Sequence, residues 1–79
     1  MTQAFIFITV EPGAEEHVLA DLKGIDWVKE AHPVYGQYDL LIKLVTPDMP
    51  TLRTTILTKI RTVWSIRSTL TMIVVEEQA

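Results

Sequence analysis

The order in which two kinds of hydrophobic pattern follow one another restricts the fold of this chain more than any other feature. Four segments have the β-branched, continuously apolar or alternating composition of strands, and two have apolar side chains at helical spacing. In chain order they read strand, helix, strand, strand, helix, strand. We expect strands at residues 4–11, 25–34, 39–45 and 66–76, a helix at residues 14–23, and a second helix that starts within residues 46–50 and extends to Val63.

Terminal signals support both helices. Glu15 and Glu16 lie in the first turn of the first helix, where the helix dipole favours acidic side chains, and Gly24 follows its last turn as a stop signal. The second helix has a proline in its first turn whether Thr46 or Asp48 caps it. Each helix therefore has a sequence signal at one terminus or at both.

This order of elements is the split βαβ plan of the ferredoxin-like fold, an α+β architecture. Its antiparallel sheet has the strand order 4-1-3-2, so the first and third strands, which are the most apolar, are central. The second strand carries Lys29, Glu30 and Pro33, which are tolerated at a sheet edge, where charge and a missing N–H group cost little. The right-handed crossover rule places both helices on one face of the sheet.

The sheet face without helices is expected to be too apolar for a monomer in water. Alternation in the third and last strands assigns Leu41, Val45, Ile73 and Val75 to this face, together with part of the first strand. A domain of this size buries only about 60–65% of the surface of its unfolded chain, and a large exposed apolar patch is typical of an interface. We therefore expect a dimer in which two sheets pack face to face.

Composition limits the function classes. The 79 residues suffice for one domain, residues 1–79, and the absence of cysteine excludes disulfides, zinc–thiolate sites, iron–sulfur clusters and a cysteine nucleophile. A formal net charge of −3 and a pI near 5.2 argue against direct nucleic-acid binding. No apolar run approaches the roughly twenty residues of a membrane span, and the N-terminus lacks the basic region of a signal peptide. We expect no membrane association and a cytoplasmic location.

Two stretches of the sequence resemble a known family. One runs from Val28 to Leu44 and contains the turn Gly36-Gln37-Tyr38-Asp39, and the other runs from Ile66 to Val75 and contains Thr69 and Thr71. A valine-rich strand, a Gly-x-x-Asp turn, an apolar strand, a helix and a final strand with threonines are typical of one domain. It is the effector-binding (RAM) domain of the leucine-responsive/AsnC (Lrp/AsnC) family of feast-or-famine transcription regulators. The resemblance covers essentially the whole chain.

The resemblance implies a small-molecule sensor. Domains of this family bind an effector, here expected to be an amino acid, in a cleft between dimers that the Gly-x-x-Asp turn lines, and the dimers assemble into rings. Full-length members also carry an N-terminal helix-turn-helix domain, for which a chain that starts on its first strand leaves no room. The chain therefore resembles a stand-alone version without a DNA-binding domain, acting through its own oligomers or by joining full-length regulators. Ser65 departs from the family, which often has glycine before the final strand.

The candidate ligand-binding residues lie in the turn and in the final strand. Glycine at position 36 leaves backbone N–H groups open to a ligand carboxylate, and Asp39 can accept hydrogen bonds from a ligand ammonium group. Thr69 and Thr71 lie two residues apart, so both hydroxyls project from one sheet face toward a polar headgroup. The ordinary alternatives are a hairpin shaped by its glycine and aspartate, and threonines present for their β-propensity. The candidate set is Gly36, Gln37, Tyr38, Asp39, Thr69 and Thr71, and at most one of Gln37 and Tyr38 faces a ligand.

The other polar and aromatic side chains give weaker signals. Arg67 shares the face of the threonines and is expected mainly in a solvated or intersubunit ion pair. His17 and His32 have no third ligand at a metal-binding spacing, so we expect neither a metal nor a cofactor. Trp27 and Trp64 are expected at the rim of the domain or in an interface. No nucleophilic arrangement of Ser, His and Asp is recognisable, so no catalytic residue is assigned.

Two other functions stay open. Dimeric α+β barrels built from ferredoxin-like halves include small cofactor-free monooxygenases and isomerases, which place His, Asn or Trp in a cavity between sheet and helices. This chain has no Asn, its helix stripes are aliphatic, and it is short for that class, so we expect no enzyme. A deep cavity holding His32 or Trp27 would favour the enzyme. The other alternative is a structural oligomer that binds no ligand.

Overall fold

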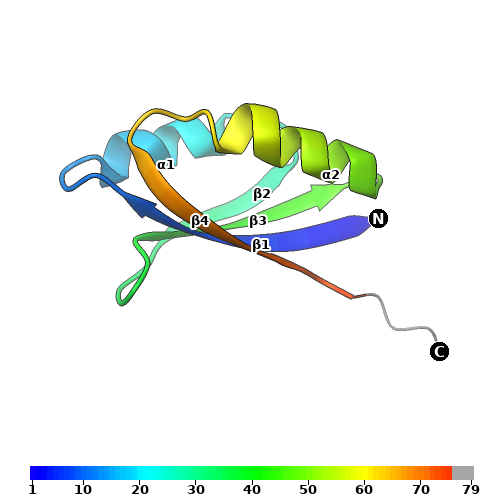
Figure 1. Ribbon diagram of the computed structural model, residues 1–79, viewed down its shortest axis with the longest axis horizontal. Coiled ribbons are helices and arrows are strands. Elements are labelled where there is room, and N and C mark those ends of the chain that lie inside the picture. Colours follow the sequence, from blue (N-terminus) through cyan, green and yellow to red (C-terminus); the bar gives the residue numbers. More distant parts are fainter. Residues whose placement is uncertain (76–79) are drawn as a thin grey trace.

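The computed structural model describes residues 1–75 and has the expected order of elements (Figure 1). The strands are β1 (Thr2–Val10), β2 (Val28–Pro33), β3 (Leu40–Thr46) and β4 (Ile66–Ile73). The helices are α1 (Glu15–Lys23) and α2 (Met49–Thr55), and α2 continues directly into a π-helical turn, η1 (Ile56–Ile60). β2 is shorter than expected because residues 25–27 form the bend that leads into it. The expected strand end at Glu76 lies outside the described residues.

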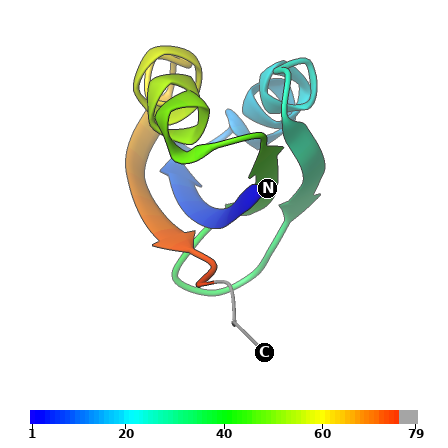
Figure 2. The ribbon, with the colours of Figure 1, turned by 90° about the vertical axis from the view of Figure 1, so that its right-hand side faces the viewer.

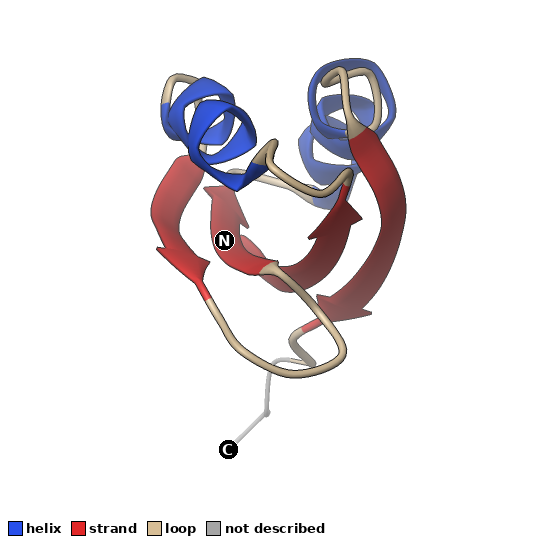
Figure 3. Ribbon diagram, turned by 90° about the vertical axis from the view of Figure 1, so that its left-hand side faces the viewer, coloured by secondary structure: helices blue, strands red, loops and turns tan. Residues whose placement is uncertain are grey.

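The four strands form one antiparallel sheet in the order β2-β3-β1-β4. This is the ferredoxin-like strand order that the sequence predicts, and β2, with Pro33 at its end, is an edge strand as expected. Both helices lie on one face of the sheet, and no described element covers the other face (Figures 2 and 3). We call the uncovered face the open face.

The core between the sheet and the helices is aliphatic. Every second residue of β1 from Ala4 to Val10 is buried, and β3 repeats this alternation from Leu40. The buried hydrophobic residues are Ala4, Ile6, Ile8, Val10, Val18, Leu22, Leu40, Ile42, Leu44, Leu52 and Ile60. Full burial of each large side chain contributes about 1.5–3 kcal/mol, so this core fixes the helices on the sheet and with them the loops at its two ends.

The structure shows which of two candidate residues, Thr46 or Asp48, caps the second helix. Asp48 is the N-cap: its carboxylate accepts the N–H of Thr51 at 2.8 Å, and a proline follows in the first turn. The hydroxyl of Thr46 donates to the carbonyl oxygen of Asp48 at 2.8 Å, so the other candidate supports the cap instead of forming it. The pKa of Asp48 lies below its ordinary value, because the side chain and then the backbone N–H of Thr51 stabilise the carboxylate.

The second helix ends in a π-helical turn that keeps its apolar residues on the core side. Leu52, Ile56 and Ile60 recur every four residues, which is wider than the 3.6 residues of an α-helical turn. The N–H of Arg61 donates to the carbonyl oxygen of Ile56, five residues earlier, at 2.9 Å. Because this turn holds more residues than an α-helical turn, Ile60 returns to the core side, where both it and Leu52 are fully buried.

The strand register corrects one expectation about the open face. Residues directly opposite one another in an antiparallel pair share a face. Leu70 and Met72 of β4 lie opposite Phe7 and Phe5, so they belong to the open face. Ile73 lies opposite Ala4, which faces the helices, so the sequence assignment of Ile73 to the open face is wrong. Val75 was assigned to the same face but lies beyond the last residue of β4, where no strand pairing defines a face. The alternation of β4 was right, but both of its faces carry apolar residues, and composition alone chose the wrong one.

Candidate functional site

Three connections meet at one end of the sheet, which we call the loop end (Figure 1). They are the β1–α1 connection at residues 11–14, the β2–β3 turn at residues 34–39 and the η1–β4 connection at residues 61–65. The N–H of Glu11 donates to the carbonyl oxygen of Ser65 at 2.9 Å, and the N–H of Asp39 donates to that of Ile8 at 2.9 Å. These bonds hold the three connections in one fixed surface.

The β2–β3 turn has the conformation that its glycine predicts. Gly36 has a φ of 126°, in the region where residues with a side chain are strained, and a Cβ atom added there would meet nothing within 4 Å. The N–H of Val34 donates to the carbonyl oxygen of Asp39 at 2.9 Å and closes the turn. Glycine is therefore required at position 36 by its backbone angle and not by lack of space.

Asp39 has a structural partner within the chain. Its Oδ2 atom accepts the N–H of Val10 at 2.9 Å in a partly buried position, which ties the turn to the end of β1. The aspartate therefore shapes the turn, as the ordinary reading of the sequence expected. Asp39 also lines a hollow of about 310 Å³ with Pro33, Val34, Tyr35 and Glu15, so its position gives it access to a surface hollow as well.

Tyr38 and Gln37, the other two side chains of the turn, do not line the hollow beside Asp39. The ring of Tyr38 lies against that of Phe7, with centroids 5.2 Å apart and planes inclined at 46°, so it belongs to the open face. Gln37 is exposed and lines none of the hollows described here. Within one chain, the hollow beside the turn therefore contacts Asp39 and neither Gln37 nor Tyr38.

The two threonines lie on the helix side of the sheet. Thr69 and Thr71 are opposite Ile8 and Ile6, which face the helices, and both threonines are half-buried. Thr69 lines a small polar hollow of about 150 Å³ with Arg61, Arg67 and Ser68. The N–H of Asp39 donates to Ile8, and Thr69 pairs with Ile8 from β4, so Asp39 and Thr69 lie on either side of the same β1 residue. Tyr38 and the two threonines, however, lie on opposite faces of the sheet.

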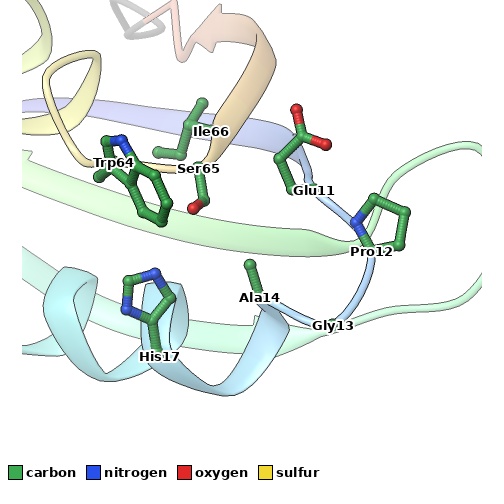
Figure 4. Close-up of a pocket in the computed structure, with 8 residues that line it drawn as sticks. All are labelled: Glu11, Pro12, Gly13, Ala14, His17, Trp64, Ser65 and Ile66. Atoms are coloured by element: carbon green, nitrogen blue, oxygen red, sulfur yellow. The ribbon is translucent and has the colours of Figure 1, made fainter.

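Sequence reasoning missed a cavity at the loop end that is larger than the hollow beside Asp39. An open cavity of about 670 Å³, the Trp64 cavity, lies between the η1–β4 connection and the start of α1 (Figure 4). Its lining residues include Glu11, Ala14, His17, Trp64, Ser65 and Ile66. The available signal was a tryptophan in the connection between a helix and a strand, which we expected at the rim of the domain or in an interface.

Histidines and carboxylates give no metal site in residues 1–75. His32 is exposed on the open face side, where its Nε2 lies 3.1 Å from Oε1 of Glu30, and Lys43 lies 3.7 Å from the same carboxylate. The hydrogen bond from His32, helped by Lys43, holds the pKa of Glu30 below its ordinary value. His17 is exposed as well, so both histidines are surface residues.

The features that would favour an enzyme are not found among the described residues. The space between sheet and helices is filled by the aliphatic core, and His32 lies outside it. Trp27 is 39% exposed and lines two surface hollows of about 310 and 340 Å³ instead of an enclosed cavity. None of the described helices has the length and hydropathy needed to span a membrane.

The comparison with family models decides the family. The model named Lrp/AsnC ligand binding domain matches residues 3–78 of the chain. The chain belongs to the Lrp/AsnC ligand-binding domain family. The resemblance inferred from the Gly-x-x-Asp turn and the threonine strand is therefore confirmed, and with it the ferredoxin-like fold of the family's ligand-binding domain.

Solved structures of Lrp/AsnC proteins resemble the chain closely. FFRP-DM1 is 40% identical, with a TM-score of 0.91, over 95% of this chain and 100% of that one. AsnC of E. coli is 30% identical, with a TM-score of 0.89, over 99% of this chain and 53% of that one. The regulator NMB0573 of Neisseria meningitidis, determined as an L-Met complex, is 20% identical with a TM-score of 0.85, over 96% of this chain and 51% of that one. No curated protein matches the chain. The family and these regulators belong to transcriptional control and not to a class of enzymes.

Proposed function

We propose that the chain is an amino-acid effector-binding and oligomerisation module that modulates transcription regulators of the Lrp/AsnC family. The observation that carries this proposal is the match to the family's ligand-binding domain over residues 3–78, with the Gly36–Asp39 turn in place at the loop end. An amino acid is the proposed ligand because NMB0573, a structural relative, forms a complex with L-Met. The function proposed needs no catalytic residue and no cofactor.

The proposed ligand site is built from the turn and the threonine strand. Backbone N–H groups at Gly36 bind the ligand carboxylate, and Asp39 accepts hydrogen bonds from the ammonium group with the oxygen that Val10 does not use. Thr69 and Thr71 lie on the other face of one chain from Tyr38, so a site that uses them all needs more than one chain. A cleft between dimers meets this requirement, with Gln37 or Tyr38 contributed by a neighbouring copy.

The open face supports the proposed dimer. It carries Phe5 and Phe7 of β1, Leu41 and Val45 of β3, and Leu70 and Met72 of β4. Leu70 and Met72 are 40% and 53% exposed, which leaves their apolar side chains in water in a single chain. Two open faces packed together remove this surface from water at about 25 cal/mol per Å² of apolar area, before the costs of association.

Rings of dimers and mixed assemblies extend the same proposal. A ligand held between dimers changes the balance of assemblies only if it binds one of them more tightly than the others. The module would then act through its own oligomers or by joining full-length Lrp/AsnC regulators through the open face, without contacting nucleic acid itself. The acidic pI near 5.2 fits a partner of regulators better than a binder of DNA.

A calorimetric screen tests the ligand part of this proposal. Wild-type protein is titrated with each of the twenty amino acids, and we expect one or a few to bind with a saturable signal. Glu16→Gln serves as the control variant, because Glu16 is an exposed acid that lines none of the hollows at the loop end. If none of the twenty binds, the amino-acid function is wrong and the structural oligomer becomes the better account.

A further inference from the structure

Trp64 exposes a large aromatic surface to the Trp64 cavity at the loop end. Its side chain is 80% exposed, although the helical residue Ile60 just before this connection is fully buried. The ring of His17 lies edge-on to it, with centroids 6.3 Å apart and planes at 70°. Figure 4 shows the two rings on facing sides of the cavity, one from a connection and one from α1. Together they form a wall suited to a flat or aliphatic group.

The backbone fixes this wall in place. Ser65, the residue after Trp64, has a φ of 79°, which is unfavourable for a residue with a side chain. The carbonyl oxygen of Ser65 accepts the N–H of Glu11 at 2.9 Å, which ties this conformation to the end of β1. A strained conformation of this kind persists because its surroundings hold it, so the backbone of the connection next to Trp64 is anchored to the end of β1.

A pair of opposite charges lies beside the wall. Oε1 of Glu11, a residue of the cavity, lies 3.9 Å from Nε of Arg67, and the two side chains are 61% and 59% exposed. Arg67 lines the small polar hollow that shares Ile66 with the Trp64 cavity. A pair so long and so exposed contributes little to stability, and a ligand can share its charges at small cost.

An α-amino acid carries groups that complement this charge pair and the aromatic wall beside it. Its ammonium group suits the Glu11 carboxylate, and its carboxylate suits the guanidinium group of Arg67, which can donate two parallel hydrogen bonds. A large side chain would then lie on the indole of Trp64. We propose that the Trp64 cavity is a second binding site, for an α-amino acid with an aromatic or large apolar side chain. This inference rests on the proposed amino-acid function and names a ligand class for a separate site.

The Trp64 cavity is separate from the turn site and open in the proposed dimer. It shares no lining residue with the hollow beside Asp39. His17 belongs to a helix, and both helices lie on the face opposite the one that we propose for dimerisation (Figures 2 and 4). Packing of two open faces therefore leaves the cavity accessible to a small molecule.

Fluorine NMR of the chain labelled with 5-fluorotryptophan tests the site directly. The chain has two tryptophans, so the spectrum has two signals to assign, and Trp64→Phe identifies that of Trp64. We expect L-phenylalanine to shift the Trp64 signal in a saturable way and L-serine to leave it unchanged. N-acetyl-L-phenylalanine and L-phenylalaninamide each lack one charge, and each should bind about tenfold more weakly or worse.

Charge variants give the matched comparison. Glu11→Gln and Arg67→Gln should each weaken L-phenylalanine binding at the Trp64 signal by about tenfold. Glu16→Gln should not change it, because Glu16 is an exposed acid of α1 that does not line the Trp64 cavity. Unchanged affinity in both charge variants, or binding of either derivative as tight as that of L-phenylalanine, would overturn the proposal.

Two further outcomes separate this inference from the proposed function. If an amino acid binds and only turn variants such as Asp39→Asn weaken it, the proposed function stands and the second site is wrong. If the wild-type chain binds none of the twenty amino acids, both fail together.

Discussion

Asp39 has two roles in this account, one structural and one in binding, and a pair of substitutions separates them. Alanine removes the acceptor of the partly buried Val10 N–H group, which should lower the free energy of unfolding by about 1–2 kcal/mol in urea denaturation. Asparagine keeps an acceptor oxygen but loses the charge, so Asp39→Asn should unfold within about 0.5 kcal/mol of wild type. Both variants should weaken binding of an amino acid.

The asparagine variant is the decisive member of this pair. Its fold is expected to be intact, so any change in ligand affinity reports on the charge of residue 39. If Asp39→Asn bound the ligand as tightly as wild type does, the carboxylate would have a structural role only.

Gly36 is expected to be sensitive to a methyl group for a backbone reason alone. Gly36→Ala should lower the free energy of unfolding by about 1–3 kcal/mol, because φ is 126° there while the surrounding space is open. Gly24→Ala is the matched control: it has an ordinary negative φ, its Cβ would lie 3.6 Å from a carbonyl oxygen, and it should be neutral or stabilising. Equal losses in both variants by urea denaturation would contradict this explanation.

Single residues show what the sequence could and could not predict. The Gly-x-x-Asp turn was predicted because its glycine and aspartate act locally, within a few residues of one another. Ser65 was recognised as unusual before the last strand, and it does take a positive φ, without the glycine that this conformation favours. The partner of Asp39, the N–H of Val10, lies 29 residues away, and no local pattern reports such a contact.

At the scale of the element, the cap of α2 gives the stability of the chain a dependence on pH. The folded pKa of Asp48 is lowered, so its contribution is complete above the pKa of the unfolded chain, about 4, and is lost as the pH falls through the folded value. Wild type should therefore be more stable than Asp48→Asn at pH 6, and this advantage should shrink at pH 3. Urea denaturation of both proteins at both pH values measures the free energies of unfolding. The difference between wild type and variant at each pH removes the effects of the other carboxylates, which both proteins share. An advantage that is the same at both pH values would rule out this cap as the source.

Strand faces were harder to predict than the strands themselves. Period-2 alternation identified β1 and β3 and their buried faces correctly, because one face of each strand is uniformly aliphatic and such a face packs into the core. β4 has threonines on one face and Leu70 and Met72 on the other, with Ile73 among the threonines. Its orientation is set by pairing with β1 more than fifty residues away, and a shift at Thr9 and Val10 alters the register there. The sequence of β4 alone therefore could not predict on which face of the sheet Thr69, Thr71 and Ile73 lie.

For the whole molecule, the open face predicts how the chain associates. Leu70→Lys places a charge among the open-face side chains opposite Phe7, and in a symmetric dimer it does so twice, so dimer affinity should fall by at least about tenfold. Leu57→Lys is the control, because Leu57 is 50% exposed on η1, away from this face. Sedimentation velocity at several concentrations compares the two. Dissociation of the Leu57→Lys variant, with an intact Leu70→Lys dimer, would place the interface on the helices.

The fold and the candidate site differ in how far one sequence determines them. Element order, crossover handedness and the charged β2 edge specified the topology, since each follows from rules that act within a chain. The proposed ligand site depends on Tyr38 and on threonines that lie on opposite faces, so it requires the register between copies. The Trp64 cavity joins residues about fifty positions apart and becomes visible only when α1 and the η1–β4 connection are placed together.

Native mass spectrometry of the wild-type chain, with and without the amino acid found by titration, tests the central claim most directly. It counts subunits and bound ligands in the same spectrum. The account predicts an assembly made of dimers that gains at least one amino acid for each subunit, with a change in the distribution of assemblies when the ligand is added. A monomer, or an oligomer whose mass does not change with any of the twenty amino acids, would contradict it.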